Sequence, residues 1–380
     1  MEFVENNIKY KIFENIIFKD RCNLRLINNK FNNIFKKYKH NKTVRTIYNK
    51  NINYNKYKNI NFILTDFNNE YKKKYKKKYK NIYILNIRFC EISYTQKLKL
   101  KKYNIHTLHL SNLYFIEKLL PNLGNVNTLK LYNLPNLKEL PSELGKVHTL
   151  ELFNLTNLIK LPSGLYNIHT LKLMGLSNLK KLSSELGNIH TLSLEYLPNI
   201  MELPLGWYNI HTLWLCNMTN IKKIPSELGN TYKLTLNNLP NITELPSELG
   251  NVHTLELFKL PNITELPSEL GNTYNLMIND LPNLKKLPLE LGNVYTLTLV
   301  RLPHLKKISL IPMNIHTLNL FFLSNLKELS PEFSNTHTLS IINLPKLNIF
   351  SKSRIYLKQY LKKTHKHIYT IYNKLISNIF

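Results

Sequence analysis

Histidine is the residue in this chain whose type and spacing come nearest to functional chemistry. Of the 13 histidines, eight recur at one place of a 21-residue repeat, among them His148, His169, His190 and His211. If the repeat places them on adjacent strands, their rings lie about 5 Å apart, close enough to couple their protonation or to hold a metal ion. No carboxylate or cysteine recurs beside them to complete a tetrahedral ligand set, and tyrosine takes the same place at Tyr232. We therefore expect a structural column of stacked rings, with no metal and no other cofactor.

Patterns typical of an active site are missing from the sequence. It contains no GxGxxG, GxxxxGK[ST], HExxH or GxSxG motif. The repeated glutamates, such as Glu143 and Glu248, have no acid or base partner at a fixed distance, so we assign them to turns. Cys22, Cys90 and Cys216 are too scattered for a disulfide framework or a metal site. The sequence therefore predicts a protein that is not an enzyme and has no catalytic residues.

The elements that position these residues come from an internal repeat. With Ile105 as position 1, the chain realigns with itself every 21 residues without a gap, in twelve turns that reach about residue 350. The consensus is V/I-H-T-L-x-L-x-x-L-P-N-L-K-E-L-P-S-E-L-G-N, with apolar residues at positions 1, 4, 6, 9, 12, 15 and 19. Positions 4 and 6 alternate with polar neighbours, which predicts a strand over positions 3 to 7.

The second half of each turn follows different rules. Proline at positions 10 and 16, as in Pro240 and Pro246, excludes both a central strand and a long helix. The pattern therefore predicts an α/β-type repeat solenoid, with one short parallel strand per turn and a mostly extended or 3-10 convex side. Glycine recurs at position 20, where we expect a positive φ. Asparagine at positions 11 and 21, as in Asn136 and Asn188, either caps backbone groups in the bends or merely tolerates a left-handed conformation.

These turns resemble the leucine-rich-repeat superfamily. The strand motif and the Leu-Pro turn of that family are matched by Leu255-Glu256-Leu257 and Leu266-Pro267, and the resemblance covers about 245 of the 380 residues. One departure is that the family's asparagine at position 9 is leucine or methionine here, as in Met218. The resemblance implies a protein-protein interaction scaffold without a small-molecule substrate, whose partner binds the concave face of an arc.

Candidate partner-binding residues follow from the strand geometry. Because positions 4 and 6 point inward, positions 3, 5 and 7 point to the concave face. Position 3 is threonine in ten of the twelve turns, which favours a structural ladder. Positions 5 and 7 are variable and partly apolar, which is typical of a binding surface, although a flanking segment or a second copy of the chain is an alternative cover. The predicted contact residues are Tyr132, Phe153, Met174, Trp214, Phe258, Met277 and Phe321.

Charge is concentrated outside the repeats. Of the net +28, residues 1–104 carry +19, residues 105–347 carry +2 and residues 348–380 carry +7. Residues 44–104 contain two strand-like echoes of the repeat, at 61–64 and 82–87, separated by a basic insertion over about 69–80. This insertion is either a solvated loop or a contact for nucleic acid or an anionic membrane. Its lysines are Lys72, Lys73, Lys74, Lys76, Lys77 and Lys78.

Residues 1–43 do not share the repeat and have apolar residues at helical spacing. The run from Asp20 to Phe31, DxxNLRLxNxxF, resembles the second half of an F-box, although the usual Leu-Pro opening is missing. The resemblance implies a Skp-family adaptor as partner and a role as substrate receptor of a cullin-RING ubiquitin ligase. With this run and the repeats, the chain is similar to F-box and leucine-rich-repeat proteins of large DNA viruses of amoebae. The alternative is that residues 1–43 form a helical cap for the solenoid. The implied adaptor contacts are Ile12, Ile16, Ile17, Leu24, Leu26 and Phe31.

The C-terminal residues 351–380 again lack the repeat. Apolar residues recur at helical intervals among seven basic residues and no acidic one, which predicts an amphipathic helix. We expect this helix to cap the last turn, with attachment to a membrane interface as the alternative. Because neither a signal peptide nor a run of 18 apolar residues is visible, we expect a cytoplasmic protein, which would be the host cytoplasm for a viral one.

Overall fold

The computed structural model describes a long series of stacked turns and three strands that precede it. Described are residues 104–347, except 115, 120–122, 124, 143, 145, 290, 292, 309–314, 330–332 and 334–335, and the backbone of β1 (Thr43–Thr46), β2 (Asn61–Thr65) and β3 (Asn81–Arg88). The chain divides into two units, Met1–Ile63 and Leu64–Phe380. In the first unit β1 lies parallel to β2. The repeats belong to the second unit.

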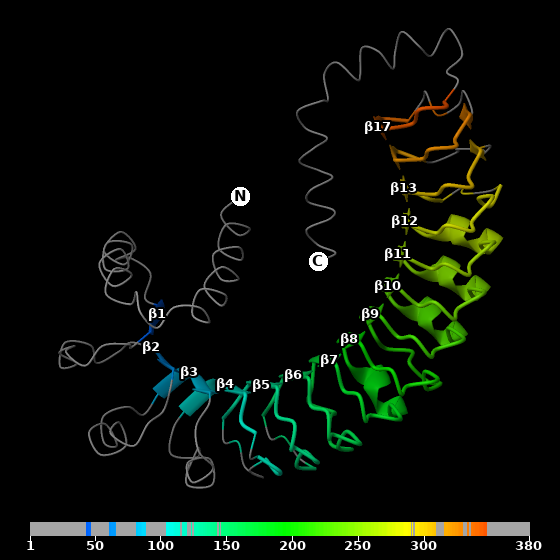
Figure 1. Ribbon diagram of the computed structural model, residues 1–380. Helices are drawn as coiled ribbons and strands as arrows, with labels where there is room; N and C mark the ends of the chain where they lie inside the picture. Colours follow the sequence, from blue (N-terminus) through cyan, green and yellow to red (C-terminus); the bar gives the residue numbers. More distant parts are fainter. Residues whose placement is uncertain are drawn as a thin grey trace, which may run out of the picture. The chain divides into compact units, whose positions relative to one another are not determined.

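The repeats form one parallel sheet in chain order. Each strand pairs with the next so that residues 21 apart face each other, as Thr128 faces Thr149 and Thr149 faces Thr170. From β5 onward each of these strands covers positions 3 to 7, as predicted, and in this unit they line the concave side of the stack (Figure 1). The strands are β4 (Asn104–Ser111), β5 (Thr128–Tyr132), β6 (Thr149–Phe153), β7 (Thr170–Met174), β8 (Thr191–Glu195), β9 (Thr212–Cys216), β10 (Lys233–Asn237), β11 (Thr254–Phe258), β12 (Asn275–Asn279), β13 (Thr296–Val300), β15 (Thr317–Phe321) and β17 (Thr338–Ile342).

A continuous apolar core lies behind this sheet. Positions 1, 4, 6, 9 and 12 are fully buried in a typical turn, as in Val126, Leu129, Leu131, Leu134 and Leu137. Burying one such side chain contributes about 2 kcal/mol, but only when a neighbouring turn covers it. The buried side chains form one cluster through the described turns, so the turns stabilise each other in series.

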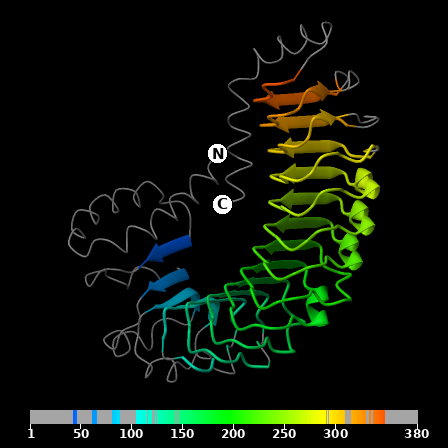
Figure 2. The same cartoon turned by 45° about the vertical axis from the view of Figure 1, so that its right-hand side comes forward.

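The convex half of the turns is mostly extended, and in four described turns it closes in a short 3-10 helix (Figure 2). These helices are η3 (Ser184–Asn188), η4 (Ser226–Asn230), η5 (Ser247–Asn251) and η6 (Ser268–Asn272). Pro225 begins η4 with φ −62°, and its carbonyl accepts a hydrogen bond from the Leu228 amide at 3.2 Å. Two short strands, β14 (Lys307–Ile308) and β16 (Glu328–Leu329), pair on the same side. The expected arc with one parallel strand per turn and little helix is therefore confirmed.

The helical flanks that the sequence predicts cannot be compared with this architecture. Residues 351–380 lie outside the described residues, and of residues 1–43 only Thr43 is described, at the start of β1. The strand-like segments at 61–64 and 82–87 coincide with β2 and β3.

The prediction that glycine at position 20 has a positive φ is wrong. Among the described glycines, only Gly175 and Gly206 have a positive φ, and neither is at position 20. Position 20 needs glycine in the turns where two backbones approach closely, whereas Tyr166 and Tyr208 take this position in two other turns. A Cβ on Gly229 would lie 2.2 Å from the carbonyl oxygen of Glu248 in the next turn, and one on Gly250 would lie 2.1 Å from the equivalent oxygen. Hydrogen is thus the only side chain that fits between these consecutive 3-10 helices.

The positive φ occurs instead at position 8, directly after each strand. Asn133 has φ 53° and Lys259 has φ 50°, so the left-handed residue is not restricted to glycine. Asparagine at this position forms a ladder: Asn133 Nδ2 donates to Asn112 Oδ1 at 3.0 Å, and Asn154 Nδ2 donates to Asn133 Oδ1 at 3.0 Å. Asparagine tolerates this conformation because its short polar side chain can hydrogen-bond locally.

The two asparagine columns predicted from the sequence have different roles. At position 11 the amide donates to a backbone carbonyl of the preceding turn, as from Asn262 Nδ2 to the Pro240 oxygen at 2.6 Å, which confirms the predicted capping. At position 21 the observed bonds join side chains, as from Asn209 Nδ2 to Asn188 Oδ1 at 3.1 Å. Through these bonds the second column ties consecutive turns together.

Candidate functional site

The concave face of the sheet brings together three of the seven residues predicted to bind a partner. Tyr132, Phe153 and Met174 lie at position 7 of consecutive strands and are partly exposed. The rings of Tyr132 and Phe153 meet edge to face with centroids 4.5 Å apart, and His109 meets Tyr132 at 4.6 Å. Such contacts hold the rings in fixed orientations. The result is a contiguous aromatic surface on β4 to β7.

Two further predicted residues lie separately at position 5. Trp214 on β9 and Met277 on β12 are both partly exposed, and their strands are separated by β10 and β11. Both residues thus lie on the same face as the aromatic surface of β4 to β7. They are not adjacent to each other in the sheet register.

Phe258 and Phe321 do not have the exposure expected of position 7. Their side chains are only 4% and 1% exposed. In the sheet register Phe258 lies between Asn237 and Asn279, and each of these is itself buried. Position 7 is therefore partly exposed on β5 to β8 and buried on β9 to β15, a difference that strand periodicity alone does not reveal.

A buried carboxylate lies beside the aromatic surface. Glu151, at position 5 of β6, is 7% exposed. Its carboxylate accepts a hydrogen bond from the Tyr132 hydroxyl at 2.5 Å and lies 3.0 Å from Lys130 Nζ and 3.6 Å from Lys172 Nζ. Burial alone would raise the pKa of Glu151, but the Tyr132 hydrogen bond and the two ammonium groups outweigh it and lower the pKa. The lysines on both sides are thereby held in place.

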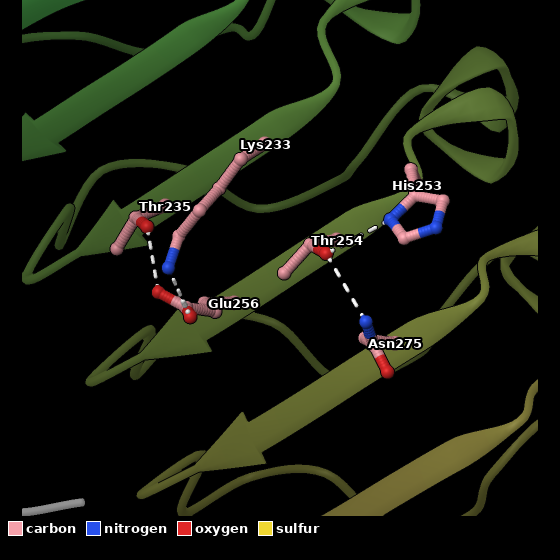
Figure 3. A network of polar contacts seen from close by, with 6 residues as sticks. All are labelled: Lys233, Thr235, His253, Thr254, Glu256 and Asn275. Carbon is pink, nitrogen blue, oxygen red and sulfur yellow. Dashed lines mark hydrogen bonds and ion pairs between the residues drawn. The ribbon is translucent and has the colours of Figure 1, made fainter.

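A second ionic network occupies the same face further along (Figure 3). Glu256 on β11 accepts from Lys233 Nζ at 2.7 Å and from Thr235 Oγ1 at 2.8 Å. The contacts of Glu151 with Lys130 and Lys172, and of Glu256 with Thr235, follow from the parallel register, because position 5 of one strand lies next to position 5 of its neighbours. Lys233 reaches Glu256 from position 3. The signal was present in the sequence as Lys130, Glu151 and Lys172 at 21-residue intervals, although no site was predicted from it.

Cysteine chemistry is not available on this face. Cys216 is buried at position 7 of β9, and burial, followed by the charge of Glu195, raises the pKa of its thiol to about 11. The thiol therefore stays protonated at neutral pH and is a poor nucleophile.

The predicted histidine column is a continuous stack of rings at the edge of the strands. Ten rings from His148 to His337 stack in sequence, with centroids between 4.3 Å (His169–His190) and 4.9 Å (His253–Tyr274) apart. The Nδ1 atom of His190 lies 3.2 Å from the hydroxyl of the following Thr191, and the same contact recurs along the column. Within the part of the chain that the structure describes, no three His, Cys, Asp or Glu side chains gather as a metal site.

Burial lowers the pKa of His190, and the neighbouring His169 and His211 lower it further. Protonating this ring would place its charge 4.3 Å and 4.4 Å from the centroids of two other imidazoles. The stack therefore disfavours a charge on the His190 ring.

Two predicted sites fall outside the described residues: the F-box-like contacts Ile12, Ile16, Ile17, Leu24, Leu26 and Phe31, and the lysines Lys72, Lys73, Lys74, Lys76, Lys77 and Lys78. The described turns contain no helix with the length and apolar character needed to cross a bilayer.

Solved structures with similar architecture include a leucine-rich-repeat protein of Leptospira interrogans and the plant peptide hormone receptor RGFR1 in complex with RGF2. The first is 21% identical, with a TM-score of 0.40, over 72% of this chain and 87% of that one. The second is 18% identical, with a TM-score of 0.27, over 64% of this chain and 62% of that one. No family model matches the chain, and no curated protein matches it.

Proposed function

We propose that this protein is a binding scaffold whose concave sheet face takes a protein partner. The observation that carries the proposal is the contiguous aromatic surface of Tyr132 and Phe153 beside Met174, with Trp214 on the same face. Partly exposed aromatic and methionine side chains are the usual anchors of protein interfaces. On strands of a stacked sheet they are held rigid before binding, which lowers the entropy cost of association.

The charges of this face point to recognition by shape and apolar contact. Glu151 is paired with Lys130 and Lys172, and Glu256 is paired with Lys233, so both of these carboxylates already have a cation. Charges neutralised within the protein contribute little long-range attraction. We expect the affinity of the concave face for its partner to change little with salt concentration.

Removing two anchors tests the proposal. Phe153→Ala together with Trp214→Ala is expected to weaken partner binding by about 100-fold or more, because truncating a central aromatic anchor costs roughly 2 kcal/mol or more. The partner is captured from the native host cell with the full chain and its affinity is then measured by titration calorimetry.

The matched control is Tyr114→Ala, which removes an exposed ring outside the strands. Circular dichroism should be unchanged in both variants. Undiminished binding by the double variant would rule out the concave face as the site.

A finer form of the proposal is that the scaffold is the substrate receptor of a cullin-RING ubiquitin ligase in the cytoplasm. Its support is the F-box-like run from Asp20 to Phe31 in the sequence. Deleting residues 1–43 is then expected to remove a Skp-family adaptor and a cullin from affinity-purified material while the concave partner remains. Recovery of the partner alone, with or without these residues, would leave a plain binding scaffold.

The alternative contact with nucleic acid or an anionic membrane rests on the +19 charge of residues 1–104. It predicts that such material co-purifies with the full chain in low salt and is released as salt rises.

A further inference from the structure

Positions 13 and 14 of each turn form two columns outside the sheet in which consecutive turns touch. At position 14, Lys118 Nζ lies 2.7 Å from Glu139 Oε1, and at position 13, Lys138 Nζ lies 3.3 Å from Glu117 Oε2. Side chains at the same position in neighbouring turns are therefore direct neighbours. In these first turns each lysine faces a glutamate, and the charges cancel.

Between β6 and β10 the residue types in the same two columns are different. Position 13 carries Ile159, Lys180, Met201 and Lys222, and position 14 carries three more lysines and Glu202. We call these residues, together with Leu205, the convex patch. All five lysines are exposed, and none forms an ion pair with any residue that the structure describes. The columns therefore hold five ammonium groups against one carboxylate.

The apolar members of the convex patch project into water. Ile159 is 59% exposed and Met201 is 69% exposed, while Leu205, at position 17 of the same turn as Met201, is 70% exposed. The fold does not require them, because position 13 is threonine in two later turns and position 17 is serine in three (Thr243, Thr264, Ser226, Ser247 and Ser268). Such exposed aliphatic side chains favour an external contact only in combination with the five lysines beside them.

The arrangement of these aliphatic side chains indicates which kind of contact they make. Along position 13 a lysine separates Ile159 from Met201, so the apolar side chains are isolated knobs. This differs from the concave face, where the rings of Tyr132 and Phe153 touch. A protein partner requires a packed apolar centre, whereas a lipid–water interface accepts each knob separately. Lysines beside the knobs match anionic headgroups.

We propose that the convex patch docks on an anionic lipid surface. The ammonium groups lie against headgroup phosphates and carboxylates, and Ile159, Met201 and Leu205 enter the boundary of the acyl chains. Because the patch lies outside the strands, the concave face stays free. The proposal does not depend on the concave face having a partner.

The test measures binding of the full chain to vesicles of phosphatidylcholine with about one-third phosphatidylserine, by flotation. The apolar variant is Ile159→Thr, Met201→Thr and Leu205→Ser, which installs residues found at the same positions in other turns. We expect the partition coefficient to fall about tenfold, because aliphatic surface no longer leaves water. Leu289→Ser is the control, since Leu289 is 71% exposed at position 17 of a turn outside the patch.

A second pair of variants separates the patch from the general positive charge of the chain. Lys180→Thr with Lys222→Thr removes two charges from the patch, and Lys285→Thr with Lys306→Thr removes two from the same position of later turns. The first pair is expected to weaken binding about fivefold per lysine, and the second much less. All variants should keep the circular dichroism spectrum and melting temperature of the wild type.

Several results would overturn the proposal. One is that wild-type protein does not float with the anionic vesicles, or floats equally with pure phosphatidylcholine. Another is that patch variants and controls bind alike, which would assign vesicle binding to the basic flanks. Loss of a protein partner from the apolar variant, without vesicle binding by the wild type, would make the convex patch a protein interface.

Discussion

At the scale of single residues, Glu151 combines burial with three polar partners. It is buried on the concave face, and Tyr132, Lys130 and Lys172 compensate for that burial. A buried carboxylate is costly without such partners, so the network fixes both lysines and the tyrosine ring in one arrangement. The concave face is thus ordered by a carboxylate that is itself buried.

Glu151→Gln is expected to lower the free energy of unfolding by about 1–3 kcal/mol at neutral pH, since two lysines lose their counter-charge. The folded-state pKa of Glu151 lies below the ordinary 4.5, so its contribution is complete above that pH. It is lost as pH falls below 4.5 through the folded pKa. The difference between variant and wild type should therefore vanish in acid, as measured by urea unfolding between pH 7 and pH 3.

Glu139→Gln is the control for this comparison. Glu139 also has a lowered pKa, caused first by its hydrogen bond from Lys118, but the pair is exposed. Exposed pairs are screened by solvent, so no measurable change is expected. Equal effects of the two substitutions would show that burial of Glu151 is unimportant.

At the scale of elements, the ring column and the 3-10 tips explain how the turns are held in register. The column adds ring contacts along one edge of the sheet, and six of its imidazoles, from His169 to His337, also contact the hydroxyl at position 3. On the convex side the glycine at position 20 lets consecutive tips touch through their backbones. Both features repeat with the strand spacing, so a change in one turn alters the contacts of the next turn.

His190 makes the stability of the protein depend on pH. Since the folded-state pKa of His190 is below 6.5, the unfolded chain binds its proton first. Stability is therefore present above pH 6.5 and falls as pH decreases through that value. His190→Tyr, which keeps a ring as at Tyr232, should reduce this loss in a series of melting temperatures from pH 8 to pH 5. The same substitution at His304, outside the column, should not; an identical effect would argue against the stack as the cause.

Gly229→Ala is expected to destabilise the protein by about 2 kcal/mol or more, because the new methyl group would lie 2.2 Å from the Glu248 carbonyl oxygen. Ser226→Ala in the same 3-10 helix adds no atom near another backbone and should have little effect. Thermal unfolding monitored by circular dichroism measures both. A stable Gly229→Ala protein would mean that the tips separate at little cost.

Much of this element structure could be predicted from the sequence, and the failures have a physical cause. The strands and the core followed from periodicity within one turn, since Leu129 and Leu131 alternate with polar residues. The role of Gly229 did not, because its restriction comes from a backbone one turn away. Likewise the burial of Phe258 depends on its neighbours in the sheet and not on its own position in the repeat.

At the scale of the whole repeat unit, the apolar core is less well covered at its C-terminal end than in the preceding turn. Leu339 and Ile341 on β17 are only partly buried, whereas Leu318 and Leu320 at the same positions of β15 are fully buried. A solenoid needs a cover at each end. Residues 351–380, which lie outside the described residues, supply an amphipathic pattern of the right kind.

Ending the chain at Phe350 is therefore expected to lower the melting temperature by several degrees, because the last core leucines lose their cover. Differential scanning calorimetry compares the truncated and full chains. An unchanged transition would show that residues 351–380 do not cap the solenoid and would favour their alternative role at a membrane interface.

The glycine contacts of the convex side also bear on how the concave side fits a partner. The spacing of the strands is fixed by their hydrogen bonds, so the bend of the stack is decided by how closely the opposite tips approach. Glycine at Gly229 and Gly250 allows the closest approach and so a shallow bend. A bulkier residue there would wedge the tips apart and tighten the curve of a binding surface it never touches. Partner selectivity would then change through substitutions on the far side of the molecule, with every contact residue intact.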